Sequence, residues 1–90
     1  MSQEQHQSNQ ESQELLEDSK SLILFNDDFN TFDFVIDTLI DVCGHDHLQA
    51  EQCALIVHHK GKCAVKSGPH TELKAPFTEM SNRDLTVTID

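Results

Sequence analysis

The sequence predicts a two-layer α+β sandwich, in which a three-stranded antiparallel sheet carries its helices on one face. Short apolar or alternating runs, typical of strands, occur at residues 21–25, 62–66 and 85–89. Segments with apolar residues at helical spacing separate these runs, which gives the order β-α-α-β-α-β. A small domain can bury such elements as one helix layer packed on one sheet.

The first strand and first helix are joined by the turn Asn26-Asp27-Asp28. SLILF, residues 21–25, is a continuous apolar run that fits a buried strand, and the turn-forming residues end it. Asn30 or Thr31 then suits a helix N-cap. The helix is expected over residues 31–43, and Gly44 ends it. Its apolar side is formed by Phe32, Val35, Ile36, Leu39, Val42 and Cys43.

The second helix is expected from Leu48 to about His59, with Gly61 beyond its end. A strand at 62–66 follows, and Ser67-Gly68-Pro69 is expected to form a turn. Thr71 can cap a third helix near residues 72–82, which Pro76 should shorten, kink or delay. The inward side of the second helix is predicted to be Leu48, Ala50, Ala54, Leu55 and Val57 or His58.

Composition divides the chain into an acidic, polar N-terminal extension, 1–20, and a core domain, 21–90. The extension is rich in Gln, Glu and Ser, and it cannot bury enough apolar surface to offset its ordering entropy, so it is expected to be flexible. The chain has 16 acidic and 6 basic residues, which argues against partners that are nucleic acids or anionic membranes. Without a transmembrane run or signal peptide, a cytoplasmic protein is expected.

The turn Asn26-Asp27-Asp28 is the first candidate site, because it combines two carboxylates and an amide between a strand and a helix. These groups suit a protonated amine, whose hydrogens all need acceptors. A divalent cation is also compatible, although such cations usually gather more oxygen ligands. An ordinary Asx turn fits the spacing equally well.

Histidines and cysteines form the second group of candidates. His58 and His59 end the second helix, where an imidazole can cap the helix, pack in the core or orient a hydrogen bond in a site. Cys43, Cys53 and Cys63 are expected to be reduced thiols. No CxxC, HxxxH, glycine-rich phosphate loop or nucleophile motif occurs, so neither a metal nor another cofactor is expected, and a binding domain is favoured over an enzyme.

Two stretches carry a resemblance to a known family. LILFNDDFNTFDFVIDTL, residues 22–39, resembles the signature of the ClpS adaptor family, and QAEQCALIVHHKGKC, residues 49–63, is similar to the helix of that family that ends in V-H-x-x-G-K. The final DLTVTID is similar to its last strand, so the resemblance covers about residues 21–90. It implies the same ClpS-like α+β fold that the pattern of elements predicts.

The resemblance implies an adaptor of the N-end rule. Such adaptors bind substrates through a free α-amino group and a bulky hydrophobic N-terminal residue, typically Phe, Leu, Tyr or Trp. They deliver them to a Clp AAA+ unfoldase such as ClpA or ClpC. Matched by position, the α-amino group would be held by Asn26, Asp28 and His58, with Asp27 beside them, and Asn26 would also bind the peptide backbone. The side-chain pocket would be lined by Phe32, Val35, Ala54, Val57 and Leu85. Glu72 and Lys74 match the unfoldase contact loosely.

Three departures from the family pattern bear on this function. Phe32 stands where many members carry a Met that excludes β-branched residues, and Ala54 stands where a larger Met is common. The segment 66–84 is several residues shorter than in many members. Two alternatives are kept: a Clp regulator that has lost degron binding, and a small zinc-binding module.

Overall fold

The computed structural model describes residues 19–90, and the element order is the predicted β-α-α-β-α-β. The predicted flexible extension therefore lies outside the described residues up to position 18. Its last two residues, Ser19 and Lys20, already belong to the first strand. The elements are β1 (Ser19–Phe25), α2 (Phe32–Cys43), α3 (His47–Lys60), β2 (Lys62–Pro69), α4 (His70–Asn82) and β3 (Thr86–Ile89).

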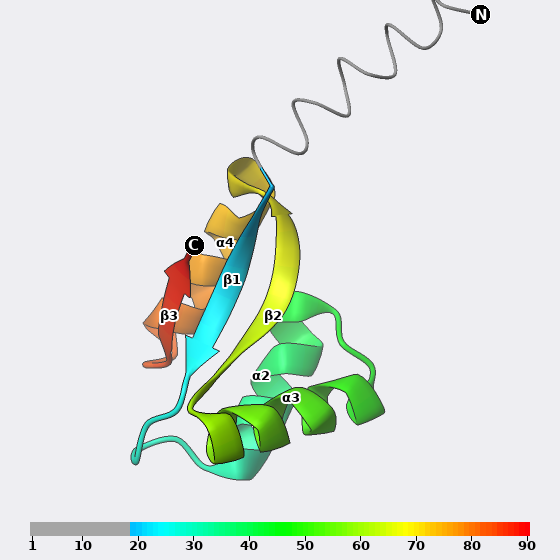
Figure 1. Ribbon diagram of the computed structural model, residues 1–90, viewed down its shortest axis with the longest axis vertical. Helices are drawn as coiled ribbons and strands as arrows, with labels where there is room; N and C mark the ends of the chain where they lie inside the picture. The colour runs from blue at the N-terminus through cyan, green and yellow to red at the C-terminus, as the bar shows by residue number, and fades with distance from the viewer. Residues whose placement is uncertain (1–18) are drawn as a thin grey trace, which may run out of the picture.

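The three strands form one antiparallel sheet with β1 in the centre, in the order β2-β1-β3. Leu22 and Leu24 of β1 are fully or almost fully buried, because they face the helices. Figure 1 shows α4 behind the sheet and α2 and α3 gathered at the end where β1 leaves it. The predicted fold class is thus confirmed.

Helix α2 begins and ends where the sequence predicts. Thr31 is the N-cap, and its hydroxyl accepts a hydrogen bond from the backbone N–H of Phe34 at 3.1 Å. Gly44 is the C-cap with a φ of 73°, in the left-handed region that favours glycine. Ile36, Leu39 and Cys43 are buried as expected, whereas Phe32 is 40% exposed.

Helix α3 is longer than predicted, and part of its predicted inward side is wrong. Asp46 caps it by accepting a hydrogen bond from Gln49 N–H at 2.7 Å, so the helix begins at His47. Leu48 is 65% exposed and Leu55 is 38% exposed, because only a narrow stripe of α3 faces the sheet. That stripe consists of Ala50, Ala54 and Val57, together with the half-buried Cys53.

Two predictions around the third helix are also wrong. Ser67-Gly68-Pro69 is not a turn, since these residues extend β2 and pair with residues 19–21 of β1. Thr71 is not the cap, because α4 already begins at His70. Pro76 was expected to shorten, kink or delay the helix, yet the helix starts two residues earlier than predicted and continues through Pro76 over 13 residues. The missing N–H of Pro76 removes one helical hydrogen bond. Burial of Leu73, Pro76 and Met80 offsets that loss.

A β-bulge in β2 anchors the loop between α2 and α3. The register shifts between Leu22 and Ile23, which leaves Val65 of β2 without a partner in β1. The Val65 carbonyl instead lies 2.6 Å from Nε2 of His45, a buried residue just beyond α2. The imidazole therefore fixes the start of α3 against the sheet.

Within residues 19–90, no helix is both long enough and apolar enough to cross a membrane.

Candidate functional site

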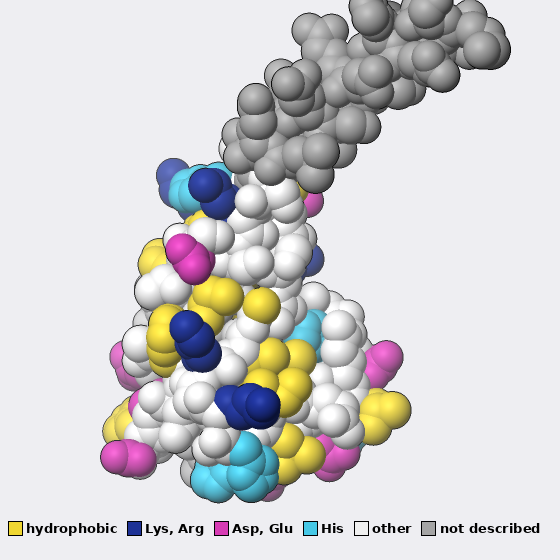
Figure 2. Space-filling view, viewed as in Figure 1, with side chains coloured by type: hydrophobic (Ala, Val, Ile, Leu, Met, Phe, Trp, Pro, Cys, Tyr) yellow, Lys and Arg dark blue, Asp and Glu magenta, His cyan; other side chains and the backbone are white. Residues whose placement is uncertain are grey.

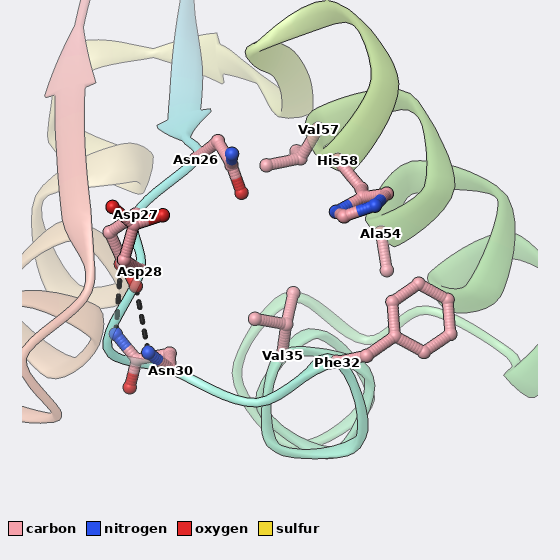
Figure 3. Close-up of a pocket in the computed structure, with 9 residues that line it drawn as sticks. All are labelled: Asn26, Asp27, Asp28, Asn30, Phe32, Val35, Ala54, Val57 and His58. Carbon is pink, nitrogen blue, oxygen red and sulfur yellow. Dashed lines mark hydrogen bonds between the residues drawn. The ribbon is translucent and has the colours of Figure 1, made fainter.

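A cavity of about 230 Å³ lies where the β1–α2 loop approaches the C-terminal half of α3. Drug-sized ligands usually occupy about 300–1,000 Å³, so this space suits a single amino-acid residue. Figure 3 shows side chains from the loop, from α2 and from α3 around one hollow. Its lining residues are Asn26, Asp27, Asp28, Asn30, Phe32, Val35, Ala54, Val57 and His58.

The polar rim of the cavity, which we define as Asn26, Asp28 and His58, keeps its side-chain hydrogen-bonding groups free of intramolecular hydrogen bonds in the described chain. All three residues are exposed, and Figure 2 shows histidine side chains gathered on the surface where α3 ends. Figure 3 shows Asn26 and His58 facing one another from opposite sides of the opening. Backbone contact holds one side in place, since Asn26 N–H donates to the Gly61 carbonyl at the end of α3 at 2.9 Å. The rim therefore offers unused acceptors to a ligand.

Asp27 differs from its neighbour because its carboxylate organises the loop. Oδ1 accepts hydrogen bonds from the backbone N–H groups of Phe29 and Asn30, at 2.9 and 2.7 Å. Oδ2 accepts one from the Asn30 side chain at 2.9 Å. Burial alone would raise the pKa of Asp27, but these hydrogen bonds stabilise the anion and bring the pKa below its ordinary value. Asp27 therefore forms an Asx turn, and the loop that contains this turn also lines the cavity.

Asn30 is a site residue that the sequence argument did not single out. Its amide donates to Asp27 and, at 2.9 Å, to the carbonyl of Asp84 in the α4–β3 connection. These hydrogen bonds, which we call the Asn30–Asp84 clasp, connect the β1–α2 loop to the α4–β3 connection. The signal in the sequence was an amide placed three residues after an Asx-turn aspartate, a spacing that suits this contact.

The apolar wall of the cavity, which we define as Phe32, Val35, Ala54 and Val57, comes from α2 and α3. Ala54 and Val57 are also members of the hydrophobic core, at 3% and 4% exposure. Two of the four wall residues therefore belong both to the cavity lining and to the hydrophobic core. Phe32 is more exposed, and Figure 3 shows its ring on the α3 side of the hollow, beneath Ala54.

Three other predicted residues lie elsewhere. Leu85 is buried at 5% exposure and is not among the residues that line the cavity. Glu72 and Lys74 are exposed in the first turns of α4, which begins at the end of the sheet opposite to the cavity (Figure 1). Within residues 19–90, no three His, Cys, Asp or Glu side chains converge on a position that could hold a metal ion.

The chain is similar to known adaptors over most of its described length. A family model described as ATP-dependent Clp protease adaptor protein ClpS matches residues 17–88. The ClpS adapter of Hydrogenovibrio crunogenus is 44% identical over 55 residues, which cover 59% of this chain and 53% of that protein. The ClpS adapter of Edwardsiella ictaluri is 38% identical over 66 residues, covering 71% and 62%. The matches thus span less than two thirds of either relative.

A solved structure supports the fold independently. Agrobacterium tumefaciens ClpS2, bound to L-phenylalaninamide, superposes with a TM-score of 0.69 at 19% sequence identity. The match covers 81% of this chain and 95% of ClpS2. At this level of identity the similarity establishes a shared architecture.

Proposed function

Since this chain belongs to the ClpS family of ATP-dependent Clp protease adaptor proteins, we propose that it is a non-catalytic adaptor that binds the first residue of its substrates. The observation that carries the proposal is the pairing of a free polar rim with an apolar wall in one residue-sized cavity. A chain start with a hydrophobic first residue has the complementary chemistry. Its amine needs acceptors, and its side chain gains by leaving water.

The rim selects the free amine. An α-amino group has a pKa of about 7.7–8.0, so it is largely protonated near neutral pH. The carboxylate of Asp28 and the carbonyl of Asn26 can accept its hydrogens, while His58 approaches from α3. An acetylated or internal nitrogen has neither the charge nor the number of donors that these acceptors require. A mismatch of this kind leaves polar groups unpaired, which discriminates more strongly than a change in apolar size.

The wall selects the side chain. Removing a Phe or Leu side chain from water contributes about 1.5–3 kcal/mol. L-phenylalaninamide, the ligand named for the ClpS2 structure, combines a free amine with an aromatic side chain, which supports the same class of ligand here. We propose N-terminal Phe, Leu, Tyr and Trp as ligands, with Phe32 and Ala54 setting the order of preference among them.

Delivery completes the proposed function. A Clp AAA+ unfoldase of the ClpA or ClpC type is the proposed partner, as the family name implies an ATP-dependent Clp protease. Glu72 and Lys74 are proposed contacts, because they are exposed on α4 away from the cavity and leave it open to the substrate.

A peptide titration tests the recognition step. A fluorescent peptide that begins with Phe is titrated with the protein, beside the same peptide acetylated at its N-terminus. Acetylation is expected to weaken binding by about 100-fold or more, equivalent to roughly 2.7 kcal/mol. Equal affinity for the two peptides would exclude amine recognition. Binding of the unfoldase without binding of either peptide would instead identify a Clp regulator that has lost degron binding.

A further inference from the structure

Two cysteines lie on the two elements that meet at Gly61: Cys53 is on α3, next to the wall residue Ala54, and Cys63 is on β2. Cys53 lies on the buried stripe of α3, three residues after Ala50 and four before Val57. Cys63 pairs with Leu24 in the sheet and therefore shares its helix-facing side. Both thiols thus point into the interface between the helix and the strand, and both side chains pack against the core.

The junction brings the two cysteines close together. Helix α3 ends at Lys60, Gly61 reverses the chain with a φ of 95°, and β2 starts at Lys62, so the segments diverge from a single residue. The Cys63 thiol donates to the Ala64 carbonyl at 3.5 Å, and it lies close enough to Cys53 to raise the pKa of that thiol. Both cysteines are free and half-buried, whereas Cys43 is 8% exposed and its sulfur lies 3.8 Å from the sulfur of Met80.

We infer that Cys53 and Cys63 are an oxidisable dithiol, which a peroxide converts into a disulfide that staples α3 to β2. One thiol attacks the peroxide: an S–O bond forms, the O–O bond breaks, and a sulfenic acid and water result. The partner thiolate then attacks that sulfur, so an S–S bond forms while the S–O bond breaks. Hydroxide leaves and takes up the proton as a second water. Two electrons pass from the thiols to the peroxide.

The staple would enclose the α3 side of the proposed binding cavity. The ring from residue 53 to residue 63 contains Ala54, Val57 and His58. It also contains Gly61, whose carbonyl holds the Asn26 backbone. An oxidised protein therefore has the α3 side of the cavity fixed to the sheet, and its response to oxidants is coupled to the binding site.

The environment of the pair sets the rate of oxidation. Burial, followed by the neighbouring thiols of Cys63 and Cys43, raises the pKa of Cys53 to about 11. The attacking species is the thiolate, so the pair reacts slowly at neutral pH and faster as the pH rises. The dithiol thus withstands brief exposure to peroxide and responds to a sustained one.

The test is mass spectrometry of the full chain after incubation with hydrogen peroxide. Free thiols are then alkylated under denaturing conditions. The expected product has lost the mass of two hydrogen atoms, carries one alkylated cysteine at Cys43, and yields a linked peptide pair containing Cys53 and Cys63. Dithiothreitol should restore three alkylated cysteines. The rate at which the disulfide forms should rise about ten-fold from pH 7 to pH 8, because the thiolate fraction rises ten-fold per pH unit well below the pKa.

Two variants keep the test decisive. Cys43→Ser retains the pair and should still lose two hydrogen masses, while Cys63→Ser should not. Stable addition of oxygen to Cys53 or Cys63 without linkage, or a linkage that involves Cys43, would overturn the inference. None of these measurements uses a peptide ligand, so the result is independent of the proposed degron binding.

Discussion

The polar rim and the apolar wall of the cavity differ in what else they do for the protein. The rim residues Asn26, Asp28 and His58 are exposed and contribute their side chains to no hydrogen bond within the described chain. The wall residues Ala54 and Val57 are buried in the core. Substitutions in the rim should therefore change ligand binding alone, whereas substitutions of Ala54 or Val57 should change ligand binding and folding together. Four predictions examine this division, from the largest expected effect to the smallest.

Leu85→Ala probes the core side of the division. Leu85 is 5% exposed and outside the lining of the cavity, so its truncation should lower the free energy of unfolding by about 2–5 kcal/mol. Peptide affinity per folded molecule should stay within two-fold of the parent. Urea unfolding and a peptide titration measure the two effects. A large loss of peptide affinity at unchanged stability would show that Leu85 contributes directly to peptide binding.

Asp28→Asn and His58→Ala probe the rim. Each should weaken binding of a Phe-initiated peptide by roughly ten-fold, about 1.4 kcal/mol, with the urea midpoint unchanged. The matched controls are Asp33→Asn and His59→Ala, which remove the same groups from exposed neighbours outside the cavity lining. If the controls weaken binding as much as the rim variants, general charge rather than the rim explains the affinity.

Asp27→Ala examines a residue that lines the cavity outside both groups and organises the loop. Loss of its turn hydrogen bonds should reduce the free energy of unfolding by about 1 kcal/mol, as for the loss of a helix cap. Because the pKa of Asp27 is lowered in the folded state, its contribution is present above the ordinary value of 3.8 and is lost as the pH falls below about 4.

Unfolding curves at pH 7 and pH 3 measure this contribution. The stability difference between the parent and Asp27→Ala should shrink in acid, because protonation removes the charge that the turn hydrogen bonds stabilise. A difference that persists at pH 3 would mean that the carboxylate acts through packing.

Phe32→Ala should have the smallest effect on folding. The side chain is 40% exposed, so the free energy of unfolding should change by about 1 kcal/mol or less. Selectivity should change more than stability, because removing the ring opens the α3 side of the cavity to N-terminal Ile and Val. A panel of peptides that differ only in the first residue measures this. An unaltered order of affinities would exclude Phe32 as a gate.

The elements of the fold were predictable because local chemistry determines them. Thr31, Gly44 and Gly61 act at helix ends as their side chains, or lack of one, would predict. The errors arose where tertiary packing overrides local preference. Ser67-Gly68-Pro69 has turn composition, yet pairing with residues 19–21 keeps it extended. Leu48 has the spacing of the apolar stripe of α3, yet its side chain is exposed to solvent.

The candidate site was predictable in its membership but less so in its roles. The resemblance assigned positions, and eight of these residues line the cavity together with Asn30. Residue type alone could not distinguish the roles of Asp27 and Asp28, because both are carboxylates. The resemblance placed Asp28 on the amine with Asp27 beside it, and the loop geometry adds that the Asp27 carboxylate accepts the hydrogen bonds of the turn. The role of Asn30 depends on the Asp84 carbonyl, a partner that only the folded chain reveals.

The Asn30–Asp84 clasp has a consequence for the time at which the site forms. The hydrogen bond joins positions 54 residues apart, and contacts of such separation close late because the intervening chain must first be ordered. During synthesis, a ribosome must expose Asp84 before the clasp can close. A nascent chain that already contains Asn26, Asp28 and His58 therefore still has a loop without its anchor. Under the proposed function, the anchored form of the binding loop is therefore completed only when the α4–β3 connection has folded.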